Sequence, residues 1–539
     1  MKTSWLNREI SQKQFDWLEV LIIVGFALVP LFASFPYRVN IFLSWDGAYR
    51  LSQGYIPFKD FSLPMGYGYW IIPGIFFKIF GPKMITLIKA QVFINILAGL
   101  SFRSIMKSFG LETGLRWMAV MLFVISYSFF NFWPWYNHTV IVYQLIGLAL
   151  LFQYLFRDRD SIRAYWLIAG ATFFLFLSFF TKQDGGGLAL LLSGAMVLYH
   201  TIVDRKFKDL GLFVGFYVLW ALIFILPLLS NGFGYWFNHG QEPHNSRIAM
   251  FDFVDVFFNE SKWEKFYLMG ILGVLIYRLK DIKTFFFDKK AFMFFLFTLG
   301  ILVEATLFQV TSYTPPNNNI YFHSFCAAFL ASQIGMMNVV NTLPRLAPLT
   351  MLVLIWWSSN FWKYLSRTVE RLLPQKEQVG DDVVSRNNFM RKNNDGAPVG
   401  MGNWVFSGID VFDNIYMPQS TKDGINRVLN RPEMKADSKI LNMTELTPLA
   451  EVVGYEIEKG RPLWYHKGVG IFQPQVDQYI AEIENNEYDL VMFEWAPTLN
   501  NFYPDDIRES LRKNYKLVDT FLAPRNPSNA DIEVYVRRF

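Results

Sequence analysis

The chain has 539 residues, of which 53% are hydrophobic, and its mean hydropathy is +0.22. A soluble protein of this length could not bury so much apolar surface in its core, so the composition favours a protein of the lipid bilayer. The net charge of +5 is modest and the basic residues lie in short segments between apolar blocks, which argues against nucleic acid as a partner. The single cysteine, Cys326, excludes an internal disulfide framework and any metal site built from several cysteines.

Apolar blocks long enough to cross a bilayer recur between residues 17 and 362. A crossing needs roughly 20 predominantly apolar residues. The first block has that length and no small-residue cleavage site follows it, so it is interpreted as a membrane helix and not as a cleaved signal peptide. The sequence predicts about eleven transmembrane helices, over 17–36, 84–105, 116–132, 139–156, 163–180, 187–203, 208–230, 264–279, 290–312, 320–341 and 346–362.

Lysines and arginines are distributed unevenly between the two sets of loops. Segments on the side of the N-terminus carry basic clusters at 103–116, 157–163, 205–208 and 278–290, whereas the opposite loops contain few basic residues. In membrane proteins the short cytoplasmic loops carry this excess. The pattern therefore predicts a multi-pass protein of the cytoplasmic (inner) membrane, with a cytoplasmic N-terminus and an extracytoplasmic C-terminal part.

One stretch, 64–82, does not fit the pattern of crossings. Its sequence PMGYGYWIIPGIFFKIFGP is apolar but short, and Pro73, Gly74 and Lys78 interrupt it. Counting it as a crossing would invert every later loop and place the basic clusters outside. Tyr and Trp prefer the headgroup level of a membrane. We therefore expect a helix that lies in the outer interface without crossing.

The composition changes after residue 362. Residues 363–400 are polar and contain NNDGAPVG, which predicts a linker or mobile segment. From 401 to 539, helical segments precede short apolar runs, as in PDDIRESLRKN followed by YKLVDTFLA, a pattern typical of a layered α/β domain. This part of the sequence has no G-x-G-x-x-G, no P-loop and no metal-spaced His or Cys. A structural or acceptor-docking role is therefore favoured over a second active site.

Polar residues gather in the loops that are predicted to lie outside. The first of these loops holds Asp46, Arg50, Lys59 and Asp60, and later loops contribute WPWYNHT (133–139), TKQDGGG (181–187), NHGQEPHNSR (238–247) and SYTPPNNNIYFH (312–323). A polar group at membrane depth is costly unless it is paired or used in function. A site for chemistry is therefore expected at the outer membrane face.

The order of these residues resembles the GT-C superfamily of membrane glycosyltransferases, and in particular its bacterial family 39-like members. The resemblance is carried by Asp46 after the first span, by the phrase Gly54-x-x-Pro57-Phe58-Lys59-Asp60-Phe61, and by an aromatic segment that ends in FKIFG (77–81). These motifs cover residues 40 to 90, and the plan of the whole chain agrees with them. The resemblance implies a GT-C-like transmembrane catalytic domain over 1–362 and a soluble extracytoplasmic α/β domain over 401–539.

The resemblance also implies a reaction, the transfer of a sugar from a polyprenyl-phosphate carrier to a glycan, lipid or protein acceptor of the cell envelope, with inversion at the anomeric carbon. Asp46 matches the family's first-loop acid and is the candidate base for the attacking hydroxyl. The departing phosphate needs cations that stabilise its developing charge. The candidates for this role are Lys182, then Arg247 beside His239 and His244, and then Lys89.

Three of these candidates also have a purely structural interpretation. Asp46 is a good N-cap residue for a helix that begins at Gly47. Lys182 and Asp184 can form a surface ion pair. Lys89 can extend its amine along an apolar stem to the interface.

Three further polar residues are candidates for substrate binding. Glu304 lies in a span near its outer end, where a carboxylate is costly, and is interpreted as functional and as a partner for Lys89. His323 is a phosphate contact or an interfacial hydrogen-bonding group. Asp60 is a second acid or a group that orients Lys59.

Gly47 follows Asp46 at a position where family members often carry a second acid. A metal bridged by neighbouring carboxylates is therefore not expected, and the lipid-linked sugar is the only co-substrate predicted, although Asp184 and Glu242 are available in other loops. Two other functions stay open. A transporter or flippase favours mid-span polar residues and repeated halves, neither of which is evident in the sequence. A non-catalytic envelope scaffold would use the α/β domain to bind partners.

Overall fold

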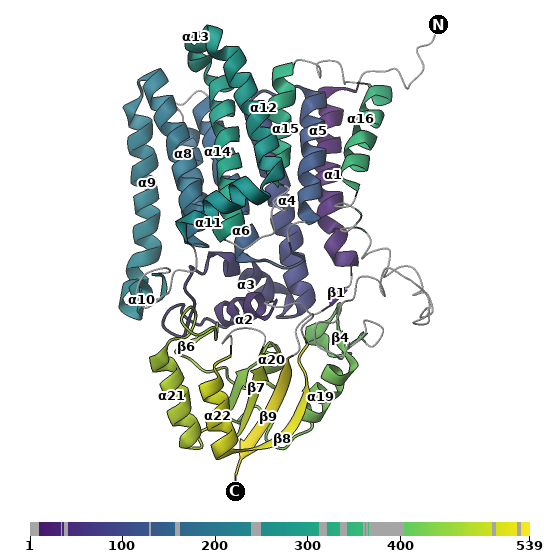
Figure 1. Cartoon of the computed structure of the whole chain (residues 1–539), viewed down its shortest axis with the longest axis vertical. Coiled ribbons are helices and arrows are strands. Elements are labelled where there is room, and N and C mark those ends of the chain that lie inside the picture. The colour runs from purple at the N-terminus through teal and green to yellow at the C-terminus, as the bar shows by residue number, and fades with distance from the viewer. Residues whose placement is uncertain are drawn as a thin grey trace.

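The computed structural model describes residues 10–33, 35–36, 41–128, 131–156, 162–238, 249–311, 321–334, 342–358, 362, 365, 404–497, 503–524 and 530–538. Figure 1 shows a bundle of helices stacked on a smaller domain that contains a sheet. The N-terminus and α13 (Ile282–Phe287) lie at one end of the molecule and the C-terminus lies at the other. The basic segment 278–290 is therefore at the end of the bundle that faces away from the C-terminal domain.

Each predicted span overlaps a helix of the bundle. These helices are α1 (Gln12–Phe32), α4 (Met84–Ser108), α5 (Thr113–Ile125), α6 (Tyr136–Phe156), α7 (Ile162–Phe179), α8 (Gln183–Asp204), α9 (Phe207–Ile225), α12 (Lys262–Arg278), α14 (Lys289–Thr311), α15 (Tyr321–Ile334) and α16 (Leu343–Trp356). In the described part of the chain, seven helical segments are long and apolar enough to cross a membrane. The multi-pass architecture is confirmed, and the number of eleven crossings stays a prediction.

The apolar surface of the bundle is distributed as expected for a chain surrounded by lipid. The segment Phe207–Asn231 begins with α9, and only 11% of its most apolar 18-residue stretch is buried inside the protein. The corresponding stretch of α6 is 78% buried. Exposed valines and leucines cover α9, including Val214, Val218 and Leu222. Such a face is stable only against an apolar solvent, so α9 lies at the lipid-facing edge of the bundle.

Two short helices separate the bundle from the C-terminal domain. They are α2 (Ile41–Ser52) and α3 (Gly68–Phe80), and both lie across the end of the bundle (Figure 1). The interpretation of 64–82 as a helix that does not cross the bilayer agrees with this position. Helix α3 has only 13 residues, fewer than the roughly 20 that a crossing needs, and it contains Pro73.

The other end of the bundle contains a buried network of ion pairs between α1, α4 and α5. Glu19 is completely buried, and its two carboxylate oxygens each lie 2.7 Å from a guanidinium Nε, one of Arg103 and one of Arg116. Asp16 contacts the same two arginines and also Lys107, at 2.7 to 3.2 Å. The basic cluster 103–116 is therefore also a structural clamp between three helices.

We expect Glu19→Ala to destabilise the bundle, by up to about 3–5 kcal/mol, because it removes the fully buried carboxylate and leaves only the partly exposed Asp16 to pair with both arginines. The measurement is the thermal unfolding midpoint of the purified protein in detergent. Asp281→Ala is the control, since Asp281 is exposed at the same end of the molecule. Equal unfolding midpoints for the two variants would show that the ion-pair network contributes little to the stability of the bundle.

The core of the C-terminal domain is a four-stranded sheet in the order β5–β7–β9–β8. Its strands are β5 (Ile440–Met443), β7 (Leu490–Trp495), β8 (Tyr515–Leu522) and β9 (Asp531–Arg537), with β5 parallel to β7 and the other pairs antiparallel. The helices of this domain are α19 (Gln419–Leu429), α20 (Leu449–Val453), α21 (Gln473–Glu484) and α22 (Asp505–Asn514). The predicted α/β domain is confirmed, while most of the predicted linker 363–400 lies outside the described residues.

Backbone pairing joins the C-terminal domain to the first loop of the bundle at two places. Strand β1 (Phe35–Pro36) pairs in parallel with β4 (Ile415–Pro418), and β4 pairs with β3 (Trp404–Phe406). Strand β2 (Phe61–Ser62) pairs in parallel with β6 (Arg461–Pro462). Because these hydrogen bonds link residues from the two ends of the sequence, the domain is fixed on α2 and α3 rather than tethered by its linker alone.

Candidate active site

Asp46 lies in the interior of α2 and is almost fully buried, with 4% of its surface exposed. The helix begins at Ile41, so the interpretation of Asp46 as an N-cap residue is wrong. Arg50 follows four residues later on the same face of the helix, and its Nε lies 2.9 Å from Asp46 Oδ1. A buried carboxylate needs such a partner. The ion pair therefore holds the Asp46 side chain in one position.

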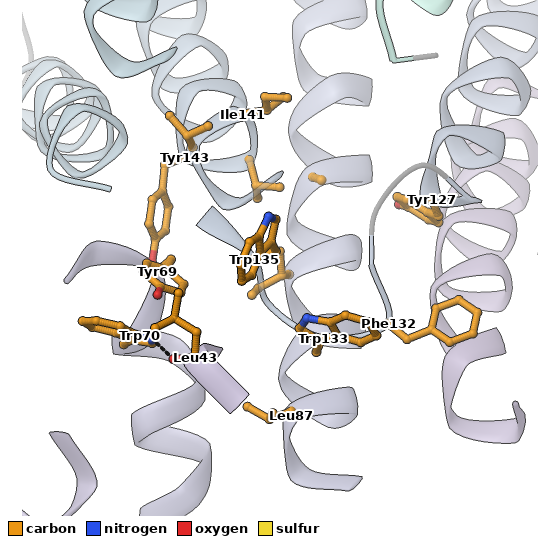
Figure 2. Close-up of a cluster of buried hydrophobic side chains, with 14 of the residues drawn as sticks. Leu43, Tyr69, Trp70, Leu87, Tyr127, Phe132, Trp133, Trp135, Ile141 and Tyr143 are labelled. Carbon is orange, nitrogen blue, oxygen red and sulfur yellow. Dashed lines mark hydrogen bonds between the residues drawn. The ribbon is translucent and has the colours of Figure 1, made fainter. Parts of the chain in front are cut away.

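The packing under α2 explains why Gly47 follows Asp46. A Cβ at Gly47 would lie 1.9 Å from Cε2 of Trp70, so no other residue fits there without moving the indole ring. The Trp70 ring is itself fixed, because its Nε1 donates a hydrogen bond of 2.9 Å to the Leu43 carbonyl (Figure 2). Figure 2 shows Trp70 next to Tyr69, within an aromatic cluster. This contact excludes a second acid directly beside Asp46.

Asp46 and Arg50 form one wall of a small pocket that is partly open to solvent. The other walls come from the C-terminal domain. In full, the pocket is lined by Asp46, Arg50, Ile440, Leu441, Asn442, Thr447, Tyr455, Ile457, Glu458, Arg461, Tyr465 and Tyr479. The candidate base therefore faces a chamber between the two domains, and the C-terminal domain supplies most of its surface.

Hydrogen bonds fix the segment 457–463 against the first loop. Nη1 of Arg50 donates a hydrogen bond of 2.8 Å to the Glu458 carbonyl, so one guanidinium joins the candidate base to the C-terminal domain. The backbone N–H of Gly460 donates to the Asp60 carbonyl at 2.7 Å, and that of Leu463 donates to the Ser62 carbonyl at 2.9 Å. The walls of the pocket therefore stand in a defined position relative to Asp46.

Two charged side chains of the C-terminal domain also line the pocket. Burial raises the pKa of Glu458, and the nearby Arg461 opposes this shift. Arg461 lies 3.4 Å from Glu458 and 2.6 Å from the second oxygen of Glu482. At a given pH, Glu458 therefore holds its proton more readily than a carboxyl group in water, and it can donate a hydrogen bond in that form.

The fold can be compared with those of known proteins. The chain superposes on the crystal structure of ArnT from Cupriavidus metallidurans in the apo state with a TM-score of 0.53 and 11% identity, over 97% of this chain and 98% of that one. The chain has the GT-C fold. A second structure of that ArnT, bound to undecaprenyl phosphate, gives a TM-score of 0.49 at the same identity and coverage. No protein-family model and no curated protein matches the sequence. The narrower, family 39-like resemblance stays a prediction.

Within the GT-C bundle, Lys182 does not line the Asp46 pocket. It precedes α8, and its Nζ lies 2.8 Å from Asp184 Oδ2 and 4.8 Å from the centre of the Phe308 ring. The expected ion pair is present, but the side chains are only 11% and 27% exposed, so the pair is partly buried and not fully at the surface. Lys89 is also outside the pocket, with its Nζ 4.9 Å from the Phe80 ring centre.

Glu304 and His323 lie deeper in the GT-C bundle. Glu304 accepts a hydrogen bond of 2.6 Å from Nε2 of Gln144 on α6, so the expected pairing with Lys89 is wrong. The physical reason is that α6, and not α4, presents its polar side chain to Glu304. Nδ1 of His323 lies 3.0 Å from the Tyr267 hydroxyl, in an aromatic surrounding. Neither residue lines the Asp46 pocket.

The remaining candidates divide into two groups. Asp60 accepts a hydrogen bond of 2.8 Å from the N–H of Ile56, so its carboxylate closes a turn in the first loop. It does not line the pocket, and no ion pair with Lys59 is present. Arg247 and His244 lie outside the described residues. Within the described ranges, no group of three or more His, Cys, Asp or Glu is placed to hold a metal ion.

Arg50 and the pocket residues of the C-terminal domain were not candidates from the sequence. The spacing of four residues between Asp46 and Arg50 in one short helix is a signal that identifies the arginine. No sequence signal identifies Asn442, Tyr455 and Glu458 as pocket residues, because they form no motif and come from a distant part of the chain.

Proposed function

We propose that this protein is an inverting glycosyltransferase that moves a sugar from a polyprenyl-phosphate donor to an acceptor at the outer face of the cytoplasmic membrane. The observation that carries the proposal is the buried Asp46–Arg50 pair, which faces a pocket at the end of a GT-C bundle. A carboxylate held in one position, with room for a hydroxyl group beside it, is what a general base needs.

The proposed reaction is a single displacement. The acceptor oxygen attacks the anomeric carbon as the bond from that carbon to the phosphate oxygen breaks, which inverts the configuration. Asp46 takes the proton of the acceptor hydroxyl, and polyprenyl phosphate departs with the electron pair of the broken bond. The developing phosphate charge needs a cation in a poorly hydrated place. No metal is required in this scheme, and the lipid-linked sugar is the only co-substrate.

Lys182 is the proposed cation for the donor phosphate, and it would exchange its contact with Asp184 for the phosphate. We expect Lys182→Ala to lower turnover by about one to three orders of magnitude, the scale of losing one electrostatic contact in the transition state. The measurement is kcat for transfer in purified membranes. Lys283→Ala is the control, since Lys283 is an exposed lysine of α13, at the end of the bundle away from the C-terminal domain. Unchanged turnover in Lys182→Ala would leave its ion pair with a structural role only.

The proposed orientation places the C-terminal domain and the pocket outside the cytoplasm. It is supported by the basic clusters of the sequence and by the position of the segment 278–290 at the far end of the bundle (Figure 1). Single cysteines introduced at Lys280 and at Lys439 test it, since a membrane-impermeant maleimide added to intact cells should label the second only. The control is the same experiment on opened cells, where both should react.

The experiment that tests the activity supplies purified protein with polyprenyl-phosphate sugars labelled in the sugar, one sugar at a time, together with envelope extract. Transfer of label from the lipid into a new product supports the proposal. Redistribution of intact labelled lipid between leaflets, with no product, would favour a transporter instead. Neither transfer nor redistribution with any sugar would favour a scaffold.

A further inference from the structure

The pocket at Asp46 belongs mainly to the C-terminal domain. Ten of its twelve lining residues come from that domain, and only Asp46 and Arg50 come from the bundle. A lipid-linked donor reaches the site from the membrane, so the side of Asp46 that faces away from the bundle is left for the other substrate. We propose that this pocket is the acceptor subsite and that it takes a neutral carbohydrate. This inference rests on the proposed function.

The uncharged lining of the pocket has the groups that sugars bind. It contains Asn442, Thr447 and three tyrosines, Tyr455, Tyr465 and Tyr479. The hydroxyl groups of these side chains are of the kind that pair with the hydroxyls of a sugar, whereas the Asn442 amide is already engaged within the protein. The Asn442 amide is already oriented, because its Nδ2 donates hydrogen bonds of 3.1 Å to the Leu446 carbonyl and to the Tyr455 hydroxyl.

Two hydroxyls in this lining lack a hydrogen-bond partner among the described residues, those of Thr447 and Tyr479. Thr447 is 8% exposed, and among the described residues its Oγ1 has no hydrogen-bond partner. Burying a hydroxyl without a hydrogen bond is costly, and such groups in a pocket are usually satisfied by water or by a ligand. Thr447 lines the same pocket as Asp46, so a sugar edge with adjacent hydroxyls that reaches the Asp46 carboxylate also comes close to the Thr447 side chain.

The charges of the pocket favour a neutral acceptor over an anionic one. Its two arginines are both bound to carboxylates, Arg50 to Asp46 at 2.9 Å and Arg461 to Glu482 at 2.6 Å. A phosphorylated headgroup or an acidic peptide would have to displace one of these carboxylates, whereas a neutral sugar would leave both pairs intact. The pocket is also small and partly open, so most of an acceptor would extend into solvent.

The first test uses the full-length protein in nanodiscs and saturation-transfer NMR. The probes are the neutral methyl glycosides of glucose, galactose, mannose and N-acetylglucosamine, with methyl glucuronide and phosphoethanolamine as anionic probes. We expect transfer to at least one neutral glycoside and none to the anionic probes. Thr447→Val, which keeps shape and removes the hydroxyl, should weaken that binding by about 3–10-fold, the range for one hydrogen bond. Thr421→Val is the matched control, since its hydroxyl bonds the Leu522 carbonyl outside the pocket.

The second test distinguishes acceptor from donor sugar. In transfer from a labelled donor to the bound glycoside, Thr447→Val should raise the KM for the glycoside and not the KM for the donor. An equal rise in the KM for the donor, or binding of the anionic probes in preference to the neutral ones, would overturn the inference. Glycoside binding without any consumption of donors would instead overturn the proposed function and leave a carbohydrate-binding pocket. Donor consumption without glycoside binding would overturn the subsite alone.

Discussion

Asp46→Asn is expected to lower sugar transfer by about 10²–10⁴-fold, the contribution typical of a positioned general base. The amide has nearly the shape of the carboxylate but cannot accept the proton of the acceptor hydroxyl. The assay is initial-rate transfer from a polyprenyl-phosphate sugar in membranes that contain equal amounts of the variant and the wild-type protein. A fluorescent fusion would report whether the variant is inserted.

Asp60→Asn is the matched control, because Asp60 is the other acid of the first loop and its carboxylate only closes a turn. It should retain most of the wild-type rate. Full activity in Asp46→Asn would refute the role of Asp46 as the base. Equal losses in the two variants would indicate that the loop, and not a particular carboxylate, is what activity needs.

Arg50→Met is expected to have the second large effect, on both stability and activity. The change leaves Asp46 as an uncompensated carboxylate in a buried place, which costs about 3–5 kcal/mol. It also removes the 2.8 Å hydrogen bond to the Glu458 carbonyl, so the C-terminal domain loses a direct link to α2. We expect a lower thermal unfolding midpoint together with a fall in turnover. Arg50→Lys keeps a cation but loses the planar guanidinium that contacts Asp46 and the Glu458 carbonyl together. Its unfolding midpoint and its turnover should therefore lie between those of Arg50→Met and wild type.

Arg427→Met provides the comparison within the same protein. Arg427 binds Asp519 through two hydrogen bonds, at 2.8 and 3.0 Å, but its side chain is 52% exposed. An exposed pair contributes only about 0–1 kcal/mol, so this variant should unfold near the wild-type temperature and keep its activity. If Arg50→Met behaved like Arg427→Met, the buried pair would not be the element that holds the pocket together.

The membrane part of the fold could be predicted because its signal is local. Each crossing is an apolar block of a certain length, and the loops between blocks differ in charge, so position and order follow from the sequence alone. The same is true of strand β7 in the C-terminal domain, which begins with four contiguous buried apolar residues, 490–493. The prediction that α3 does not cross the bilayer followed from its length and from Pro73, and its place across the end of the bundle agrees with that prediction.

The site was predictable only in part, because most of it comes from packing between distant segments. Asp46 could be identified as a candidate by its motif. The partner of Glu304 could not, since it depends on which of several helices faces α14, and α6 supplies Gln144 there. The contribution of Glu458 depends on the pairing of β2 with β6, two strands of two residues each, which are too short to give a sequence signal.

The link between Arg50 and Glu458 has a consequence for the synthesis of the protein. The two residues are 408 positions apart, and a ribosome that adds about 5–20 residues per second needs roughly 20–80 s to make the intervening chain. During that time the bundle is already entering the membrane, while the wall over Asp46 does not yet exist. If the proposed function holds, a nascent chain would carry the candidate base without its pocket, and a protein truncated by a late stop codon would occupy the membrane as an inactive bundle.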